Sequence, residues 1–155
     1  ADAGRLLNWL STANVDLEDT VTYTQWLAEA GTIEADLTVS RIGEGQYLVV
    51  ATDTMHRHVE TWLRRHVGDL RVTIADVTGA YAMLNLQGPQ SRALLAMLTS
   101  EDVSNVAFPF RRVKELDVGY ARAICNRITY VGELGYELYV PAEMAQEVYG
   151  RVIEA

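Results

Sequence analysis

The sequence is short of cysteine and of basic residues and has no long apolar run, and each shortage excludes a class of protein. Cys125 is the one cysteine among 155 residues, which excludes an internal disulfide and a cysteine-based zinc cluster and favours a reducing, cytoplasmic compartment. The 13 Lys and Arg residues against 21 Asp and Glu give a formal charge of −8, whereas nucleic-acid-binding domains carry a basic surface. Apolar runs such as residues 47–51 are far shorter than the roughly 20 residues that cross a membrane. We expect neither nucleic acid nor a membrane as a partner.

The sequence does contain enough apolar material for a folded core. Hydrophobic residues make up 49% and charged residues 22%, which is an ordinary globular mixture, and the length suits about one domain. Ala1 opens no signal-peptide pattern, and Ala155 stands within a predicted helix that has no stop signal. We therefore expect a fragment of a longer protein, with the other domains of that chain as its partners.

The spacing of apolar residues changes along the chain between the period of a strand and that of a helix. Strands are expected at residues 22–27, 33–42, 47–51, 72–74, 80–86, 112–118, 121–129 and 135–140. Helices are expected at residues 5–10, 52–67 and 90–98, and Pro141 is expected to open a fourth, because proline suits the first helical position.

Strands joined by short turns, with helices placed between groups of strands, predict an α+β fold with antiparallel sheets. They do not predict a doubly wound parallel sheet. The preferred layout is two split β-α-β, ferredoxin-like halves that meet at Gly88-Pro89, one over residues 1–87 and the other over residues 88–155.

The histidines and the cysteine offer little chemistry. His56 and His58 are two residues apart on a predicted helix and point in different directions, so they are no metal pair. His66 suits the end of the same helix, where a positive charge is favourable. Cys125 lies in an apolar strand, where an inert buried thiol is expected. The candidate site residues are therefore carboxylates.

Asp36 is the first candidate, because it stands inside a strand between Leu37 and Ala35, and strands disfavour aspartate. If its face of the sheet looks into a cavity, the carboxylate needs a cationic or hydrogen-bond-donating partner, which a ligand could supply. The other interpretation is a carboxylate on the solvent face of an edge strand.

Glu133 is the second candidate. It lies between Gly132 and Gly135, which permit unusual backbone angles and the close approach of a ligand, and Tyr130 and Tyr136 flank it at three residues. A carboxylate can accept two parallel N–H bonds from a planar edge such as that of a pterin or a guanine, and tyrosines can pack on flat rings. The alternative is a surface glutamate in a glycine-containing hairpin.

Four motifs in order resemble one known family over nearly the whole chain. They are Tyr-Thr-Gln-Trp-Leu at residues 23–27, Gly-Thr-Ile-Glu-Ala-Asp-Leu-Thr-Val at 31–39, Leu-Asn-Leu-Gln-Gly-Pro at 84–89, and Ile-Thr-Tyr-Val-Gly-Glu-Leu-Gly-Tyr-Glu at 128–137. These segments are similar to the folate-binding domain of the glycine-cleavage T-protein (aminomethyltransferase) family. Within that family, the sequences of these motifs are most similar to the branch that is fused to dimethylglycine and sarcosine dehydrogenases.

The resemblance implies a T-protein-type fold that binds tetrahydrofolate and transfers an aminomethyl or methylene unit to it from an amine-derived donor, without a metal. It assigns Asp36 to catalysis, as a proton acceptor or donor at the reactive nitrogens, and Glu133 to the pterin edge. It places Tyr23, Gly132 and Tyr130 in the same folate pocket. FAD is implied only if an amine dehydrogenase domain is fused outside this fragment.

The resemblance has one departure and leaves alternatives open. The family carries asparagine after the third strand, where this chain has Ala51, which suits the dehydrogenase-fused branch or an altered site. The domain could bind folate without catalysis, or it could be a structural or regulatory module of a multidomain amine dehydrogenase. The isolated chain is expected to fold but to be inactive and a poor folate binder, because pocket walls from other domains are missing.

Overall fold

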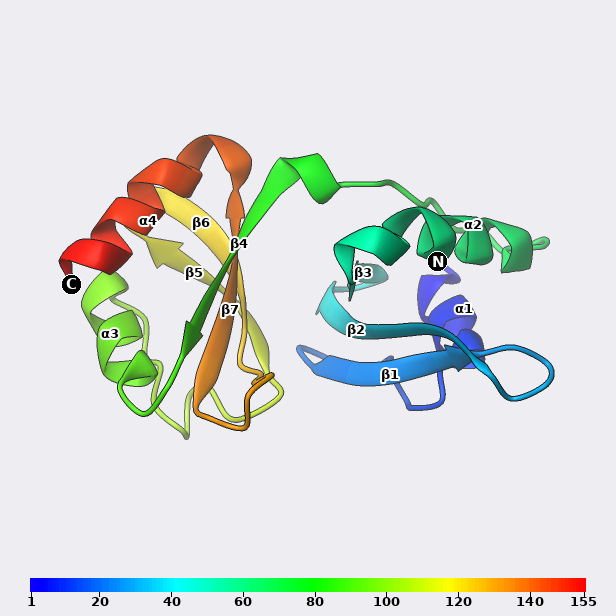
Figure 1. Cartoon of the computed structure of the whole chain (residues 1–155), viewed down its shortest axis with the longest axis horizontal. Helices are drawn as coiled ribbons and strands as arrows, with labels where there is room; N and C mark the ends of the chain where they lie inside the picture. Colours follow the sequence, from blue (N-terminus) through cyan, green and yellow to red (C-terminus); the bar gives the residue numbers. More distant parts are fainter. The chain divides into compact units, whose positions relative to one another are not determined.

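The computed structural model describes residues 1–155 as two compact units, Ala1–Asp76 and Val77–Ala155 (Figure 1). Each unit has its own antiparallel sheet and its own hydrophobic core, which confirms the expected α+β class with antiparallel sheets. The division falls before strand β4 (Tyr81–Gln87) and not after it at residue 87. The reason is that β4 pairs along its whole length with β7 (Gly135–Pro141) of the second unit.

The first unit is a three-stranded meander with helices at its two ends. Its elements are α1 (Ala3–Leu10), β1 (Val21–Leu27), β2 (Ile33–Gly43), β3 (Gln46–Ala51), the short 3₁₀-helix η1 (Asp53–Met55) and α2 (His56–His66). The strand order β1-β2-β3 confirms the expected meander. The unit is not a split β-α-β half, because its three strands follow one another without an intervening helix.

The core of the first unit lies on one face of this sheet. Trp26, Leu37 and Val39 are fully or almost fully buried there against side chains of both helices, among them Leu6 of α1 and Val59 of α2. Because successive side chains of a strand point to opposite faces, Asp36 and Thr38 of β2 lie on the other face of the sheet.

Residues 72–74, which were expected to be a strand, pair with no other strand. Val72 and Ile74 are instead partly buried side chains of an irregular segment that packs on the core of the first unit. Their alternating pattern arises from this packing, so the strand prediction was wrong here.

Helix α1 lies close to the sheet of its unit at Gly4. A Cβ atom at this position would lie 2.7 Å from Oδ2 of Asp16 and would also overlap the hydroxyl of Tyr47. Tyr47 donates a short hydrogen bond to Asp16, and Arg41 forms an ion pair with the same carboxylate at 3.1 Å. The three side chains thus form a fixed cluster, and only glycine leaves room for it beside α1.

The second unit has a four-stranded antiparallel sheet of order β4-β7-β6-β5. Its remaining elements are η2 (Thr78–Ala80), α3 (Ser91–Leu98), β5 (Val113–Val118), β6 (Ala121–Asn126), η3 (Ala142–Met144) and α4 (Ala145–Glu154). The expected hairpin across Gly119-Tyr120 is confirmed, although β6 ends at Asn126, short of residue 129. Pro141 ends β7 with extended backbone (ψ 133°) and does not open the helix.

Helices α3 and α4 lie on the same side of the second sheet (Figure 1), and the core of this unit is formed between them and the strands. Phe108, Leu138 and Val148 are completely buried in it. Cys125 is also there, and burial raises the pKa of its thiol, as expected for an inert cysteine. The helices of both units are too short and too polar to cross a bilayer.

Candidate functional site

Asp36 lies on the exposed face of the first sheet, opposite the core. It is placed directly across from Gln25 of β1, whose Nε2 donates to Oδ1 of Asp36 at 3.4 Å. The side chain of Asp36 is exposed, so the interpretation as a carboxylate partly buried in a cavity is wrong for this structure. The solvent-face interpretation is confirmed, except that β2 is the central strand of its sheet and not an edge strand.

Tyr23 shares this face with Asp36. In the register of β1 and β2, Tyr23 stands opposite Thr38, and Gln25 stands opposite Asp36, so the four side chains form two adjacent cross-strand pairs. Tyr23 is 57% exposed. The arrangement presents a carboxylate, an amide and a phenol together, which can accept hydrogen bonds from a ligand and can hold or take up a proton.

Ala51, the position at which the sequence departs from the family, ends β3. It pairs with Leu37 of β2 and packs against the core of the first unit. Residue 51 therefore lies on the face of the sheet opposite to Asp36, where an alanine fits and an asparagine side chain would need a polar partner.

The second candidate group lies in the second unit, in the loop between β6 and β7. Tyr130, Gly132 and Glu133 are exposed there, with Gly132 at φ +80°, a backbone conformation that glycine adopts readily. The carboxylate of Glu133 makes no hydrogen bond or ion pair with another residue. It is therefore free to accept hydrogen bonds from a ligand, as the sequence pattern predicts for this position.

The two tyrosines that flank Glu133 have different environments. Tyr130 is 90% exposed, and its ring is available to pack on a flat ligand. Tyr136 is completely buried, packs beside Phe108 and accepts a hydrogen bond from Nε of Arg92 at 3.1 Å. The expectation that both rings could pack on a ligand is therefore wrong for Tyr136, which belongs to the core.

The ends of this loop are bound to the segment that joins β4 to α3. The backbone N–H of Gly88 and the hydroxyl of Ser91 both donate to the carbonyl oxygen of Leu134, each at 2.9 Å. The hydroxyl of Thr129 donates to Oε1 of Gln87 at 3.1 Å. Sequence reasoning singled out the motif at residues 84–89 only as a resemblance and gave its side chains no role.

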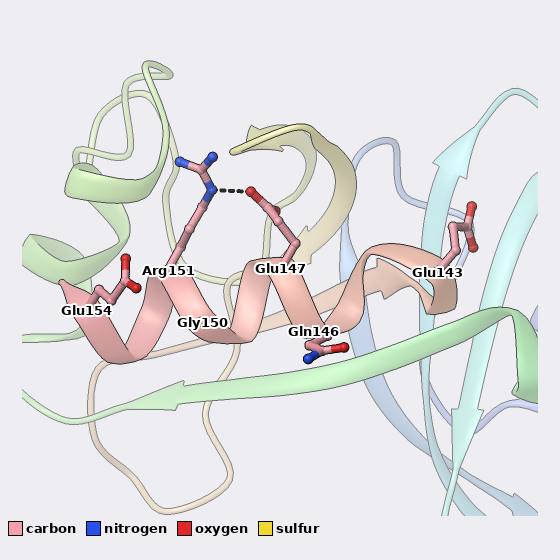
Figure 2. Close-up of a pocket in the computed structure, with 6 residues that line it drawn as sticks. All are labelled: Glu143, Gln146, Glu147, Gly150, Arg151 and Glu154. Atoms are coloured by element: carbon pink, nitrogen blue, oxygen red, sulfur yellow. Dashed lines mark hydrogen bonds and ion pairs between the residues drawn. The ribbon is translucent and has the colours of Figure 1, made fainter.

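A cavity of about 370 Å³ adjoins this contact. Its lining is formed by the same segment, namely Asn85, Leu86, Gln87, Gly88, Pro89, Gln90, Ser91 and Leu94. A larger, open depression of about 650 Å³ runs along α4 and is lined by Glu143, Gln146, Glu147, Gly150, Arg151 and Glu154 (Figure 2). Neither cavity includes a residue that the sequence proposed for ligand binding.

The depression along α4 is an acidic helix surface. Figure 2 shows Arg151 directed at Glu147, with which it forms an ion pair one helical turn away. Since the one cation is neutralised, Glu143 and Glu154 leave the depression with net negative charge. It does not attract an anionic ligand, so it is a poor candidate for the site of a folate, which carries carboxylates.

The histidines have structural contacts. Nε2 of His58 lies 3.0 Å from the carboxylate of Glu34, and Nδ1 of His66 lies 2.7 Å from the carbonyl oxygen of Trp62. The rings of Trp62 and His66 are 4.6 Å apart. The structure contains no group of three or more His, Cys, Asp or Glu side chains placed to hold a metal ion.

Comparison with known proteins places the chain in a family. The family model described as "GCVT N-terminal domain" matches residues 1–155. The 4-methylaminobutanoate oxidase (formaldehyde-forming) of Paenarthrobacter nicotinovorans is 36% identical over 99% of this chain and 19% of its own length. Human mitochondrial dimethylglycine dehydrogenase is 32% identical over 99% of this chain and 18% of its own length. The chain therefore spans about a fifth of these relatives.

The fold has a counterpart among solved structures. The crystal structure of glycine cleavage system aminomethyltransferase T from Bartonella henselae superposes with a TM-score of 0.82 at 22% sequence identity. The match covers 99% of this chain and 41% of that chain. Together with the family match over every residue, this shows that the chain belongs to the family of the GCVT N-terminal domain.

Proposed function

We propose that this chain binds tetrahydrofolate and serves the transfer of a one-carbon unit to it within a larger enzyme. The observation that carries the proposal is the carboxylate of Glu133, which is exposed, has no partner in the protein and sits in a loop whose two ends are bound to a neighbouring segment. Membership of the GCVT N-terminal domain family supports the same chemistry.

The residues of the loop fit a pterin. The ring edge of a pterin presents parallel N–H donors, and an exposed carboxylate such as that of Glu133 can accept two of them at once. The exposed ring of Tyr130 offers a surface for stacking. Gly132 adds no side chain on this surface, and a Cβ there would meet no atom within 4 Å, which leaves open space for a ligand.

Asp36 is the proposed acid or base of the transfer. Tetrahydrofolate, when bound, supplies two nitrogen nucleophiles that take up the carbon. The role proposed for Asp36 is to accept or return a proton at one of these nitrogens, since it is an exposed carboxylate. Gln25 holds one oxygen of the carboxylate at 3.4 Å, which leaves the other oxygen for the ligand.

The donor proposed here is a methylated amine. Two relatives are named for 4-methylaminobutanoate and dimethylglycine, both of which carry an N-methyl group. Oxidation of such an amine requires a redox cofactor, for which FAD on another domain is proposed. The single buried Cys125 supports a reducing compartment, and we propose the cytoplasm.

The proposal is tested on the full-length protein by titration with tetrahydrofolate and by an assay of methylene-tetrahydrofolate formation. Asp36→Asn should lower turnover ~10²-fold or more with little change in affinity, on the scale of a positioned acid or base. The matched control is Glu44→Gln, an exposed carboxylate in the turn between β2 and β3, which should leave both quantities unchanged.

Glu133→Ala tests the other half of the proposal. Loss of a charged hydrogen-bond acceptor costs about 1.5–3 kcal/mol, so affinity for tetrahydrofolate should fall roughly 10- to 150-fold. The thermal midpoint should stay unchanged, because the exposed carboxylate of Glu133 makes no hydrogen bond or ion pair with another residue. Unchanged affinity would remove Glu133 from the site, and tight binding without turnover in the wild type would make the domain a non-catalytic folate-binding module.

A further inference from the structure

The loop that carries Glu133 is held at both ends by one segment, which runs from the end of β4 into the start of α3. At one end, the carbonyl of Leu134 accepts hydrogen bonds from the N–H of Gly88 and the hydroxyl of Ser91. At the other end, Thr129 donates to the side chain of Gln87. The exposed tip, at residues 130–133, lies between these two attachments.

Gln87 is itself fixed in position. Its Nε2 donates to Oδ1 of Asn85, so that Oε1 is directed at Thr129. A Cβ at residue 135 would lie 2.5 Å from Cδ of Gln87, and closer still to both of its terminal atoms. Residue 135 must therefore be glycine if the amide of Gln87 is to pass across β7 and reach Thr129.

Ser91 occupies a protected position at the other attachment. Its side chain is 4% exposed, and its hydroxyl donates to a carbonyl that adjoins Glu133 in the chain. A hydrogen bond of this kind is shielded from competing water, which favours a single conformation of the loop end. The second bond, from Gly88, fixes the same carbonyl from the backbone.

We propose that Gln87 and Ser91 are positioning residues for Glu133, and this proposal rests on the proposed function. They hold the two ends of a loop whose tip makes few contacts, so that the carboxylate meets its ligand without first having to be ordered. Ordering a loop on binding costs affinity, and a loop fixed in advance avoids that cost. The assignment also gives a physical link between the motif at residues 84–89 and the motif at residues 128–137.

The test separates this role from a general contribution to folding. In the full-length protein, Gln87→Ala and Ser91→Ala should each weaken tetrahydrofolate binding by roughly 5- to 30-fold, the size expected for a lost buried hydrogen bond. The matched control is Gln90→Ala, because Gln90 is exposed in the same turn and makes no side-chain bond to the loop. Ser91→Thr keeps the hydroxyl and should restore most of the affinity.

A double-mutant comparison shows whether the effect passes through Glu133. In a Glu133→Ala background, Gln87→Ala should change the affinity by less than 2-fold, because the group that it positions is absent. Additive losses would overturn the proposal, since they would mean that Gln87 acts independently of Glu133. An equal loss of thermal stability with Gln87→Ala and Gln90→Ala, together with equal affinities, would also overturn it.

Amide hydrogen exchange of the ligand-free protein keeps the two proposals distinguishable. Exchange of the Gly88 amide, which donates to the carbonyl of Leu134, should rise at least several-fold in Gln87→Ala and Ser91→Ala but not in Gln90→Ala. Unchanged exchange would overturn the positioning role even if folate binds. Failure of the wild type to bind tetrahydrofolate, with the exchange pattern as expected, would instead overturn the proposed function and the ligand role with it, while leaving the two attachments established.

Discussion

Replacing Gly4 by alanine tests the close approach of α1 to the sheet of the first unit. Alanine favours a helix over glycine by about 0.5–1 kcal/mol, so an exposed position would be stabilised. At Gly4 the added Cβ would instead overlap the side chains of Asp16 and Tyr47. These two side chains are hydrogen-bonded to each other, so neither can move away from the Cβ without breaking that hydrogen bond. We expect the substitution to destabilise the first unit.

The magnitude follows from the two opposing effects. Overpacking costs typically 1–3 kcal/mol, and loss of the hydrogen bond between Tyr47 and the charged Asp16 costs about 1.5–3 kcal/mol if the clash is relieved by separating them. The helix-propensity gain offsets up to about 1 kcal/mol of this. The net loss is about 1–2 kcal/mol. The matched control is Gly150→Ala in α4, where a Cβ meets no atom within 4 Å and a gain of about 0.5–1 kcal/mol is expected.

Urea unfolding can follow the first unit selectively. The three tryptophans, Trp9, Trp26 and Trp62, all lie in Ala1–Asp76, and Trp26 is completely buried. With a slope of about 2 kcal/mol per molar urea, the fluorescence midpoint of Gly4→Ala should fall by about 0.5–1 M. Gly150 lies in the second unit, which has no tryptophan, so unfolding of Gly150→Ala is followed by circular dichroism, which detects the secondary structure of both units. A Gly4→Ala midpoint equal to or above that of the wild type would refute the steric reasoning.

Two further predictions concern titrating groups. Burial, followed by the hydrogen bond to Asp16, raises the pKa of Tyr47 from 10.0 to about 12, so the folded state retains a proton that the unfolded state loses between these pH values. The free energy of unfolding of the first unit should therefore decrease from about pH 10 to pH 12. Tyr47→Phe should make this decrease smaller when unfolding is followed by tryptophan fluorescence at a series of pH values. The same pH dependence in the variant and the wild type would contradict the raised pKa of Tyr47. Because burial raises the pKa of Cys125, a thiol reagent at pH 8 should label it only after unfolding, and rapid labelling of the native protein would place the thiol at the surface.

The sequence predicted local structure well where the alternation of apolar and polar residues alone determined which side chains are buried. Leu37 and Val39 alternate with Asp36 and Thr38, and the sheet does bury the first pair, while Asp36 is exposed and Thr38 is partly buried on the other face. The same alternation at Val72 and Ile74 was misleading, because a strand also requires a partner with free hydrogen-bonding groups, and the fold provides none there.

The candidate site was predictable in part. The glycines on either side of Glu133 marked a loop open to a ligand, and the structure does expose that carboxylate. The attachments through Gln87 and Ser91 could not be derived from spacing, because their partners lie 42 and 43 residues away in the chain. Whether a tyrosine near Glu133 faces a ligand or the core depended on strand register, which placed Tyr136 inside.

The chain passes from an exposed carboxylate at Glu133 to a completely buried ring at Tyr136 within four consecutive residues, and this has a consequence for comparing relatives. The two positions serve different ends: Tyr136 is part of the hydrophobic core, whereas Glu133, in the role proposed above, serves only the ligand. Under that proposal, a relative that retains Tyr136 and lacks the carboxylate should be a folded domain that does not bind folate. Neighbouring residues of one motif can in this way indicate two separate properties of a relative, its fold and its ligand binding.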